Sequence, residues 1–206
     1  NKTPVVEAPP APPMPEPRRS VAFIGSECYP FVKTGGLGDV AAALPKALAA
    51  SPNTEVFVFL PYYKSIRENP EFVMEQVAQF NVPLGWRNIH TTLYRAVTRR
   101  KKLQYYFVDS GYHFDRDGTY GYPDDCERFA FFSKAILESL QYLNWYPDVI
   151  HANDWQTALV PVFLKAFYQG LEAYRPIRTL FTIHNMEYQG KIGKDFVNDC
   201  LALPWD

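Results

Sequence analysis

Short apolar runs alternate along the chain with longer segments in which apolar residues recur every three or four positions. The short runs have the length and composition of strands that are buried on both faces. They lie at residues 21–24, 56–60, 103–108, 148–151 and 179–183. Helical spacing fills residues 37–50, 127–143 and 157–168. This alternation predicts an α/β fold with a doubly wound, mostly parallel, Rossmann-like sheet and right-handed crossovers.

Two helical segments carry more specific expectations. In the segment 127–143, one apolar stripe predicts a helix face that packs on the sheet as core, not as a ligand site. The stripe consists of Phe129, Phe132, Ile136, Leu140 and Leu143. In the segment 37–50, Pro45 predicts a kink or an early break of the helix. Residues 72–108 hold several β-prone segments.

The first nineteen residues differ from the rest of the chain. Pro, Ala and Glu dominate from Pro4 to Pro17, which predicts an extended, polyproline-like linker or tail at 1–19. Residues 20–206 are then expected to form one domain with a core of ordinary size. No secretory or transit signal is visible at the start, where the first residue is Asn1.

Composition and charge exclude several classes of partner. The formal net charge of −1 gives no reason to expect nucleic acid or an anionic membrane surface. The one basic cluster, residues 99–102, is predicted to be a solvated turn between strands. Three widely spaced cysteines favour a reducing compartment. No apolar run reaches the ~18 residues of a membrane span.

Polar and ionisable residues follow the predicted strands directly. Because ligands bind beyond the carboxyl ends of parallel strands, we expect these residues to converge on one site. A purely structural domain does not need such convergence. The residues are Gly25-Ser26-Glu27 and 33–39 after the first strand, Asp109-Ser110-Gly111, His151-Ala152-Asn153-Asp154-Trp155, and His184-Asn185.

The glycine-rich loop suits an anion. Gly35 and Gly36 permit close backbone approach just before a helix N-terminus, where free N–H groups and the helix dipole attract negative charge. Lys33 adds a full positive charge. Taken alone, the loop is equally a tight strand-to-helix turn, because it matches neither the dinucleotide-binding glycine motif nor a P-loop.

Three longer motifs strengthen the functional interpretation. They are Lys33-Thr34-Gly35-Gly36-Leu37-Gly38-Asp39-Val40, preceded by Ser26-Glu27 and Pro30-Phe31; His151-Ala152-Asn153-Asp154-Trp155-Gln156; and Thr182-Ile183-His184-Asn185 with Tyr188-Gln189-Gly190. The segment Asp115-Arg116-x-Gly-x-Tyr120 lies between the first two. In order and spacing, residues 20–206 resemble bacterial glycogen synthases and plant starch synthases.

The resemblance implies the N-terminal, acceptor-side lobe of a two-lobed GT-B type glycosyltransferase. Such enzymes use ADP-glucose, sometimes UDP-glucose, to extend an α-1,4-glucan or maltooligosaccharide with retention of configuration. No cofactor or metal is expected. The implied roles are catalysis for His184 and Asp154; donor binding for Lys33, Thr34, Gly35, Gly36 and Asp39; and sugar or acceptor binding for Asn185, Tyr120 and His151. Cys28 is interpreted as a packing residue.

Two other functions and one structural role stay open at this point. The chain could be a non-catalytic glucan-binding module, or a metal-dependent hydrolase with His151, Asp154, His184 and Asp39 as ligands. For His151, a buried core position is as well supported as ligand contact. The synthase interpretation expects a C-terminal lobe as partner and no turnover by these 206 residues alone. The choice between ADP- and UDP-glucose is left open. The resemblance implies bacterial cytoplasm or plastid stroma as the compartment, and the first is preferred because no transit peptide is visible.

Overall fold

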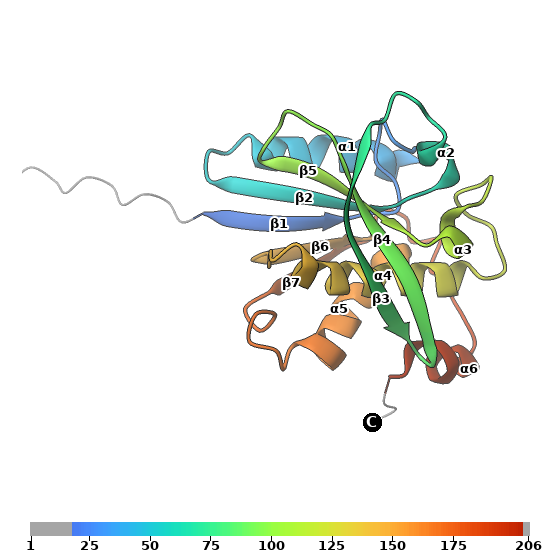
Figure 1. The fold of residues 1–206 in the computed structure, drawn as a ribbon. Coiled ribbons are helices and arrows are strands. Elements are labelled where there is room, and N and C mark those ends of the chain that lie inside the picture. The colour runs from blue at the N-terminus through green and yellow to red at the C-terminus, as the bar shows by residue number, and fades with distance from the viewer. Residues whose placement is uncertain (1–17, 204–206) are drawn as a thin grey trace, which may run out of the picture.

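A seven-stranded sheet organises the domain, and five of its strands are parallel (Figure 1). The computed structural model describes residues 18–203, so most of the predicted linker lies outside the described residues. The strands are β1 (Arg19–Ile24), β2 (Thr54–Pro61), β3 (Met74–Leu84), β4 (Arg87–Ala96), β5 (Leu103–Asp109), β6 (Val149–Asn153) and β7 (Arg178–Thr182). Their order is β3-β4-β5-β2-β1-β6-β7, with β3 and β4 antiparallel. The predicted α/β class is confirmed.

The centre of the sheet is apolar because both of its faces are covered. β1 pairs with β2 on one side and β6 on the other, with Phe23 beside both Val58 and His151. Phe23 and Val58 are completely buried. Parallel strands covered on both faces need continuous apolar runs, which is the pattern seen in the sequence.

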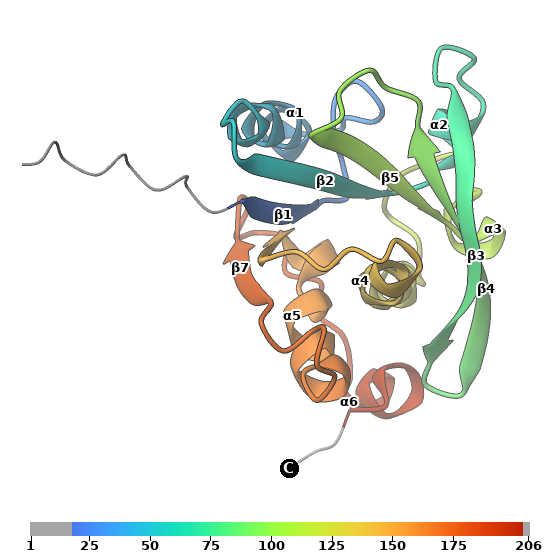
Figure 2. The same ribbon diagram turned by 60° about the vertical axis from the view of Figure 1, so that its left-hand side comes forward.

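Helices cover the two faces of the sheet (Figure 2). α1 (Gly36–Ala49) lies on one face against β2 and β5, while α4 (Asp125–Tyr142) and α5 (Leu159–Phe163) lie on the other. The remaining helical segments are α2 (Lys64–Arg67), α3 (Gly111–Phe114), a 3-10 turn η1 (Trp155–Thr157), α6 (Lys194–Phe196), and the π-helical turns η2 (Leu164–Tyr168) and η3 (Val197–Leu201).

α4 is more deeply enclosed than its apolar stripe predicts. Phe129, Phe132, Ile136 and Leu140 are buried as expected, but Phe131 on another side of the helix is also completely buried. The cause is the β3–β4 hairpin, which curls away from the rest of the sheet so that β3 packs on α4 (Figure 2). α5 also packs on α4. α4 therefore forms the centre of a second core on this face.

The early break predicted at Pro45 is wrong, since α1 continues through it to Ala49. Proline has no amide hydrogen, so the carbonyl of Ala41 loses its usual helical donor. The thiol of Cys28 donates to this carbonyl instead, with Sγ 3.3 Å from the oxygen. Burial raises the pKa of Cys28 to about 12, which keeps the donor proton in place. Cys28 is thus a packing residue, as interpreted from the sequence.

Surface features agree with the charge pattern. Arg99, Arg100, Lys101 and Lys102 are all exposed in the turn between β4 and β5, as predicted. In the part of the chain that the structure describes, none of the helices has the length and apolarity needed to cross a membrane.

Candidate functional site

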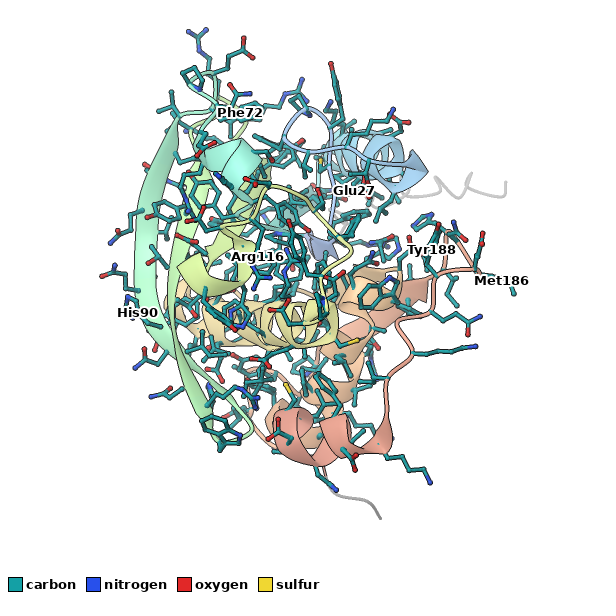
Figure 3. All side chains as sticks on the ribbon, turned by 90° about the vertical axis from the view of Figure 1, so that its right-hand side faces the viewer. Glu27, Phe72, His90, Arg116, Met186 and Tyr188 are labelled. Carbon is teal, nitrogen blue, oxygen red and sulfur yellow. The ribbon has the colours of Figure 1, made fainter. Side chains whose placement is uncertain are left out.

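A cleft of about 850 Å³ opens at the carboxyl ends of the central parallel strands. Four segments that are distant in sequence line it: the loop after β1 with the start of α1, the loop before α4, the turn after β6, and the segment after β7. Figure 3 shows Glu27 beside α1, and Tyr188 lies midway along the segment between β7 and α6. The lining residues are Glu27, Thr34, Gly35, Gly36, Leu37, Val40, Tyr120, Gly121, Asp125, Asp154, Trp155, Gln156, His184, Asn185 and Tyr188.

Glu27 holds the glycine loop from behind. Its Oε2 accepts hydrogen bonds from the amides of Thr34, at 2.6 Å, and Gly35, at 3.0 Å. Its Oε1 accepts from the Thr34 hydroxyl at 2.5 Å. A carboxylate at a helix N-terminus is stabilised by the same dipole that attracts a phosphate. The first two amides of the loop are therefore taken by the protein itself, and a ligand must use those from Gly36 onward.

Lys33 and Asp39 form an ion pair at the outer side of this loop. The ammonium lies 2.7 Å from Asp39 Oδ1, and both side chains are substantially exposed. Gly38 makes room for the lysine, because a Cβ there would meet Lys33 Cγ at 2.9 Å. Neither Lys33 nor Asp39 lines the cleft. An exposed pair contributes only ~0–1 kcal/mol, so Lys33 is easily released towards an anion.

Tyr120 connects the second wall of the cleft to the first. Its hydroxyl lies 2.7 Å from Ser26 Oγ and 2.9 Å from Glu27 Oε1. Burial raises the pKa of Tyr120, so the phenol stays protonated and donates. Tyr120 is thus a neutral donor fixed against the loop after β1.

A buried arginine supports the Tyr120 loop. Arg128 is completely buried on α4, and its guanidinium donates to the carbonyls of His113, at 2.7 Å, and Thr119, at 3.1 Å. The same side chain pairs with Asp125 Oδ1 at 2.5 Å. Asp125 Oδ2 in turn accepts from the Gly121 amide at 2.7 Å. The loop is held by charge-assisted bonds, which are stronger than hydrogen bonds between neutral groups.

Asp154 adopts a strained backbone conformation. Its φ of 58° and ψ of 176° lie in a region that is populated almost only by glycine. Such strain costs about 1–3 kcal/mol and concentrates at functional sites. Asp154 Oδ1 accepts from the amides of His184, at 2.6 Å, and Asn185, at 3.4 Å. The strained turn after β6 thereby positions the segment after β7.

The ring of His184 is oriented by a buried amide. His184 Nε2 lies 2.9 Å from Asn153 Oδ1, while Asn153 Nδ2 donates to the carbonyls of Ile24 and His151. Because the amide nitrogen is used as a donor, its oxygen is the acceptor, and Nε2 of His184 carries the proton. Nδ1 of a neutral His184 is then left to accept a hydrogen bond from a ligand.

The structure does not bring His151 to the cleft. The side chain is 7% exposed, its Nε2 lies 2.8 Å from Thr182 Oγ1, and its ring packs edge-on against Phe23. Burial, followed by the neighbouring His184, lowers the pKa of His151. A neutral histidine between β1, β6 and β7 has a structural role, so its predicted contact with sugar lacks support.

Trp155 supports the outermost wall. A Cβ on Gly190 would lie 2.2 Å from the Trp155 ring, so the segment after β7 passes directly over this indole. Gly190 also has a φ of +57°, which favours glycine. The ring itself packs edge-on against Phe129 of α4 at 5.2 Å. Tyr188, two residues before Gly190, is 66% exposed at the mouth of the cleft.

The charges that line the cleft are acidic and already engaged. Glu27, Asp125 and Asp154 each accept at least two hydrogen bonds from the protein. Between residues 18 and 203 no three His, Cys, Asp or Glu side chains gather in a way that could hold a metal ion. The hydrolase alternative therefore has no ligand set there, since Asp39 is paired with Lys33 and His151 is in the core.

Most predicted site residues share the cleft, and several important ones were missed. Thr34, Gly35, Gly36, Tyr120, Asp154, His184 and Asn185 line it, whereas Lys33, Asp39 and His151 do not. Asp109, also expected at this edge, pairs instead with Arg67 at 2.6 Å. Glu27, Asn153 and Trp155 were present in the motifs but had been given no role. Their position directly after β1 and β6 was the available signal.

A doubly wound sheet with a polar cleft at its carboxyl edge defines a ligand-binding lobe of the α/β class. Comparison with known proteins then gives the family. Residues 20–206 match the starch synthase catalytic domain, and the chain belongs to this family.

Its curated relatives are glycogen synthases. The enzyme of Exiguobacterium sibiricum is 47% identical over 188 residues and that of Clostridium acetobutylicum 45% over 184 residues; in both, the match covers 89% of this chain and 38% of the relative. The chain therefore spans less than two fifths of the length of these relatives.

A solved structure confirms the predicted GT-B fold class. The catalytic domain of starch synthase IV from Arabidopsis thaliana, bound to ADP and acarbose, superimposes with a TM-score of 0.80 at 29% identity. The match covers 90% of this chain and 37% of the other.

Proposed function

We propose that this domain is the acceptor-side lobe of an ADP-glucose-dependent α-1,4-glucan synthase, which transfers glucose to the non-reducing end of a glucan with retention. The observation that carries the proposal is the shared cleft, in which the Gly35-Gly36 turn faces the same space as His184 and Asn185. The starch synthase IV relative, which binds ADP and acarbose, supports a nucleotide and a glucan as ligands.

The donor diphosphate is proposed to bind at the start of α1. Glu27 already occupies the amides of Thr34 and Gly35, so the α1 N-terminus offers Gly36 and later amides to the leaving group. Its dipole favours an anion by roughly 0.3–1 kcal/mol when exposed, and by up to ~2 when partly buried. Lys33 adds a full charge once it leaves Asp39. Further cations are expected from the second lobe.

The sugar is proposed to lie between His184 and the acidic wall. Glycosyl transfer with retention develops positive charge on the sugar ring, which the engaged carboxylates of Asp154, Asp125 and Glu27 favour. The free Nδ1 of His184 can accept a hydrogen bond from a sugar hydroxyl and so fix the reacting geometry. Each of these carboxylates is occupied by protein donors, which supports front-face departure and attack over a covalent intermediate.

The test uses the complete enzyme of which this domain is part. His184→Ala and Lys33→Ala are expected to lower kcat/KM for ADP-glucose by about 10²–10³ while the fold is retained. Lys101→Ala, in the exposed β4–β5 turn, is the matched control and should keep full activity. Normal transfer in both site variants would refute the proposal.

Three finer points belong to the same proposal. The 206-residue chain alone is expected to transfer no glucose, which separates a catalytic lobe that needs its partner from an independent enzyme. ADP-glucose is preferred to UDP-glucose as donor, without cofactor or metal, and a competition assay on the complete enzyme decides between the donors. Bacterial cytoplasm remains the compartment we propose.

A further inference from the structure

Gln156 lines the cleft, but none of the contacts described above involves its side chain. The residue lies in η1 between Trp155 and Thr157 and is 9% exposed. Its Oε1 is enclosed by protein and has no hydrogen-bond partner among residues 18–203. Within the same residues, Nε2 makes no hydrogen bond either. Nothing in the described chain therefore fixes the orientation of this amide.

The backbone around Gln156, in contrast, is held firmly. The Gln156 carbonyl accepts from the Ser133 hydroxyl of α4 at 3.4 Å. The Thr157 hydroxyl donates to the carbonyl of Asn153 at 2.8 Å, and the Thr157 amide donates to that of Asp154 at 3.1 Å. The turn is thus fixed to α4 and to the end of β6, so the freedom is confined to the side chain.

An enclosed carbonyl oxygen without a donor destabilises the fold. In the unfolded chain this oxygen is bonded to water, and the folded chain loses that bond without a replacement. Most buried polar atoms in proteins do have a partner, so an exception needs a physical reason. Groups that lower stability and make no contact within the protein are typical of sites that meet a ligand.

Most other polar side chains of the cleft are already bonded to the protein. The three carboxylates and the Tyr120 hydroxyl are engaged as described above, and Asn185 Oδ1 accepts from the Glu187 amide at 2.9 Å. His184 offers Nδ1, which is an acceptor only. Gln156 differs from these groups because it carries both a donor and an acceptor that the protein does not use.

An unbonded amide matches a pair of neighbouring hydroxyl groups. Its oxygen accepts a hydrogen bond and its nitrogen donates one, while each hydroxyl of a sugar can do either. A fully ionised diphosphate offers acceptors only, so it would leave Oε1 without a donor. Its charge would also lie near the Asp154 carboxylate, two residues before Gln156. The chemistry of Gln156 therefore suits the sugar and not the diphosphate.

We propose that Gln156 is a substrate-binding residue whose amide turns into the cleft and bonds two neighbouring hydroxyl groups of one glucose unit. The choice of glucose as the sugar rests on the proposed function of the cleft. The donor glucose and the terminal unit of the acceptor glucan both carry such hydroxyl pairs, and kinetics distinguish the two. Gln156 thus weakens the free fold and strengthens the complex.

The test replaces the amide with an apolar group of nearly the same shape, in Gln156→Met. The urea midpoint of the 206-residue chain is expected to rise, because the unpartnered oxygen is removed. In the complete enzyme, the KM should rise about 10-fold or more, for ADP-glucose if the sugar is the donor and for maltopentaose if it is the acceptor. Gln141→Met, at an exposed position of α4 outside the cleft, is the control and should change neither quantity.

The opposite signs of these two effects separate a ligand contact from a structural role. A lower urea midpoint in Gln156→Met would show that an enclosed water molecule or a protein group bonds the amide, and it would overturn the inference. Unchanged KM values for both substrates would overturn it as well. If Gln156→Met does not fold, Gln156→Ala takes its place, with the same expected rise in KM.

The kinetics also separate this inference from the proposed function. If His184→Ala lowers kcat/KM while the Gln156 variants behave as the wild type, the inference about Gln156 fails and the proposed function stands. If His184→Ala also transfers glucose normally, the proposed function fails with it.

Discussion

The Tyr120 hydroxyl donates to the Glu27 carboxylate at 2.9 Å, across 93 positions of sequence. Glu27 also holds the amides of Thr34 and Gly35, so one buried carboxylate joins two walls of the cleft. The shape of the proposed donor site therefore depends on a residue that need not touch the donor. Glu27 is a positioning residue.

Glu27→Gln tests this dependence. The amide has one acceptor oxygen where the carboxylate has two, so some of the four donors now bound must lose their partner. Each unsatisfied buried group costs about 1–3 kcal/mol. In the complete enzyme we expect the KM for ADP-glucose to rise about 10-fold or more. The exposed Glu68→Gln is the control, and an unchanged KM in Glu27→Gln would show that the loop needs no anchor.

At Asp154 a glycine variant should be more stable than an alanine variant, which is the reverse of the usual order. Asp154→Gly removes the backbone strain, worth about 1–3 kcal/mol, while it loses the bonds to His184 and Asn185. Asp154→Ala loses the same bonds and keeps the strain. Urea unfolding of the chain should therefore find the alanine variant less stable than the glycine variant by about 1–2 kcal/mol. The opposite order would mean that this turn is unstrained.

Gly190 and Gly193 form a matched pair in one segment. Gly190→Ala places a methyl group 2.2 Å from the Trp155 ring at a positive φ, whereas a Cβ on Gly193 meets nothing within 4 Å. We expect Gly190→Ala to displace the segment from Trp155 and to weaken ligand binding. The positive φ alone costs an alanine about 1–2 kcal/mol, and the contact with the ring adds to this cost. Trp155 fluorescence and thermal unfolding measure this, and Gly193→Ala should match the wild type in both.

His113 should make the fold sensitive to acid. Burial lowers the pKa of His113 from 6.5 to about 4, against the attraction of Asp124 and with Arg128 and Arg116 adding to the decrease. Below pH 6.5 the unfolded chain binds a proton at His113, whereas the folded chain binds it only near pH 4. The free energy of unfolding is therefore highest above pH 6.5 and decreases by about 3 kcal/mol as the pH falls from 6.5 to 4.

The His113 prediction is checked by the pH dependence of urea midpoints. His113→Gln should flatten the decrease in stability between pH 6.5 and 4, because glutamine takes up no proton in that range. The exposed His90→Gln is the control and should retain the full decrease. Equal pH profiles for wild type and His113→Gln would remove His113 as the cause.

The sequence predicts the parallel sheet and the cleft edge well because both depend on local signals. Apolar runs identified β1, β2, β5, β6 and β7, and polar residues at their ends identified most of the site. His151 shows the limit of this logic. The strand predicted at 148–151 continues to Asn153, so His151 lies within β6 and packs against Phe23. Asp154 and Trp155, beyond the end of the strand, line the cleft.

Long-range packing explains most of what could not be predicted. The curl of the β3–β4 hairpin encloses α4, and no single segment encodes that contact. The Cys28 thiol that replaces the amide missing at Pro45 comes from another loop. Glu27 likewise takes loop amides that local reasoning assigned to a phosphate. In each case a partner distant in sequence or across a loop decides the local outcome.

The order of strands in the sheet has a consequence for biosynthesis. β1 is made first, yet its neighbour β6 and the His184 segment beyond β7 emerge from the ribosome more than a hundred residues later. Loop closure over such distances is slow, and a nascent chain exposes the unpaired edge of β1 until β6 arrives. The ligands proposed for the cleft cannot assist these early stages, since its lining is complete only when translation has passed Tyr188.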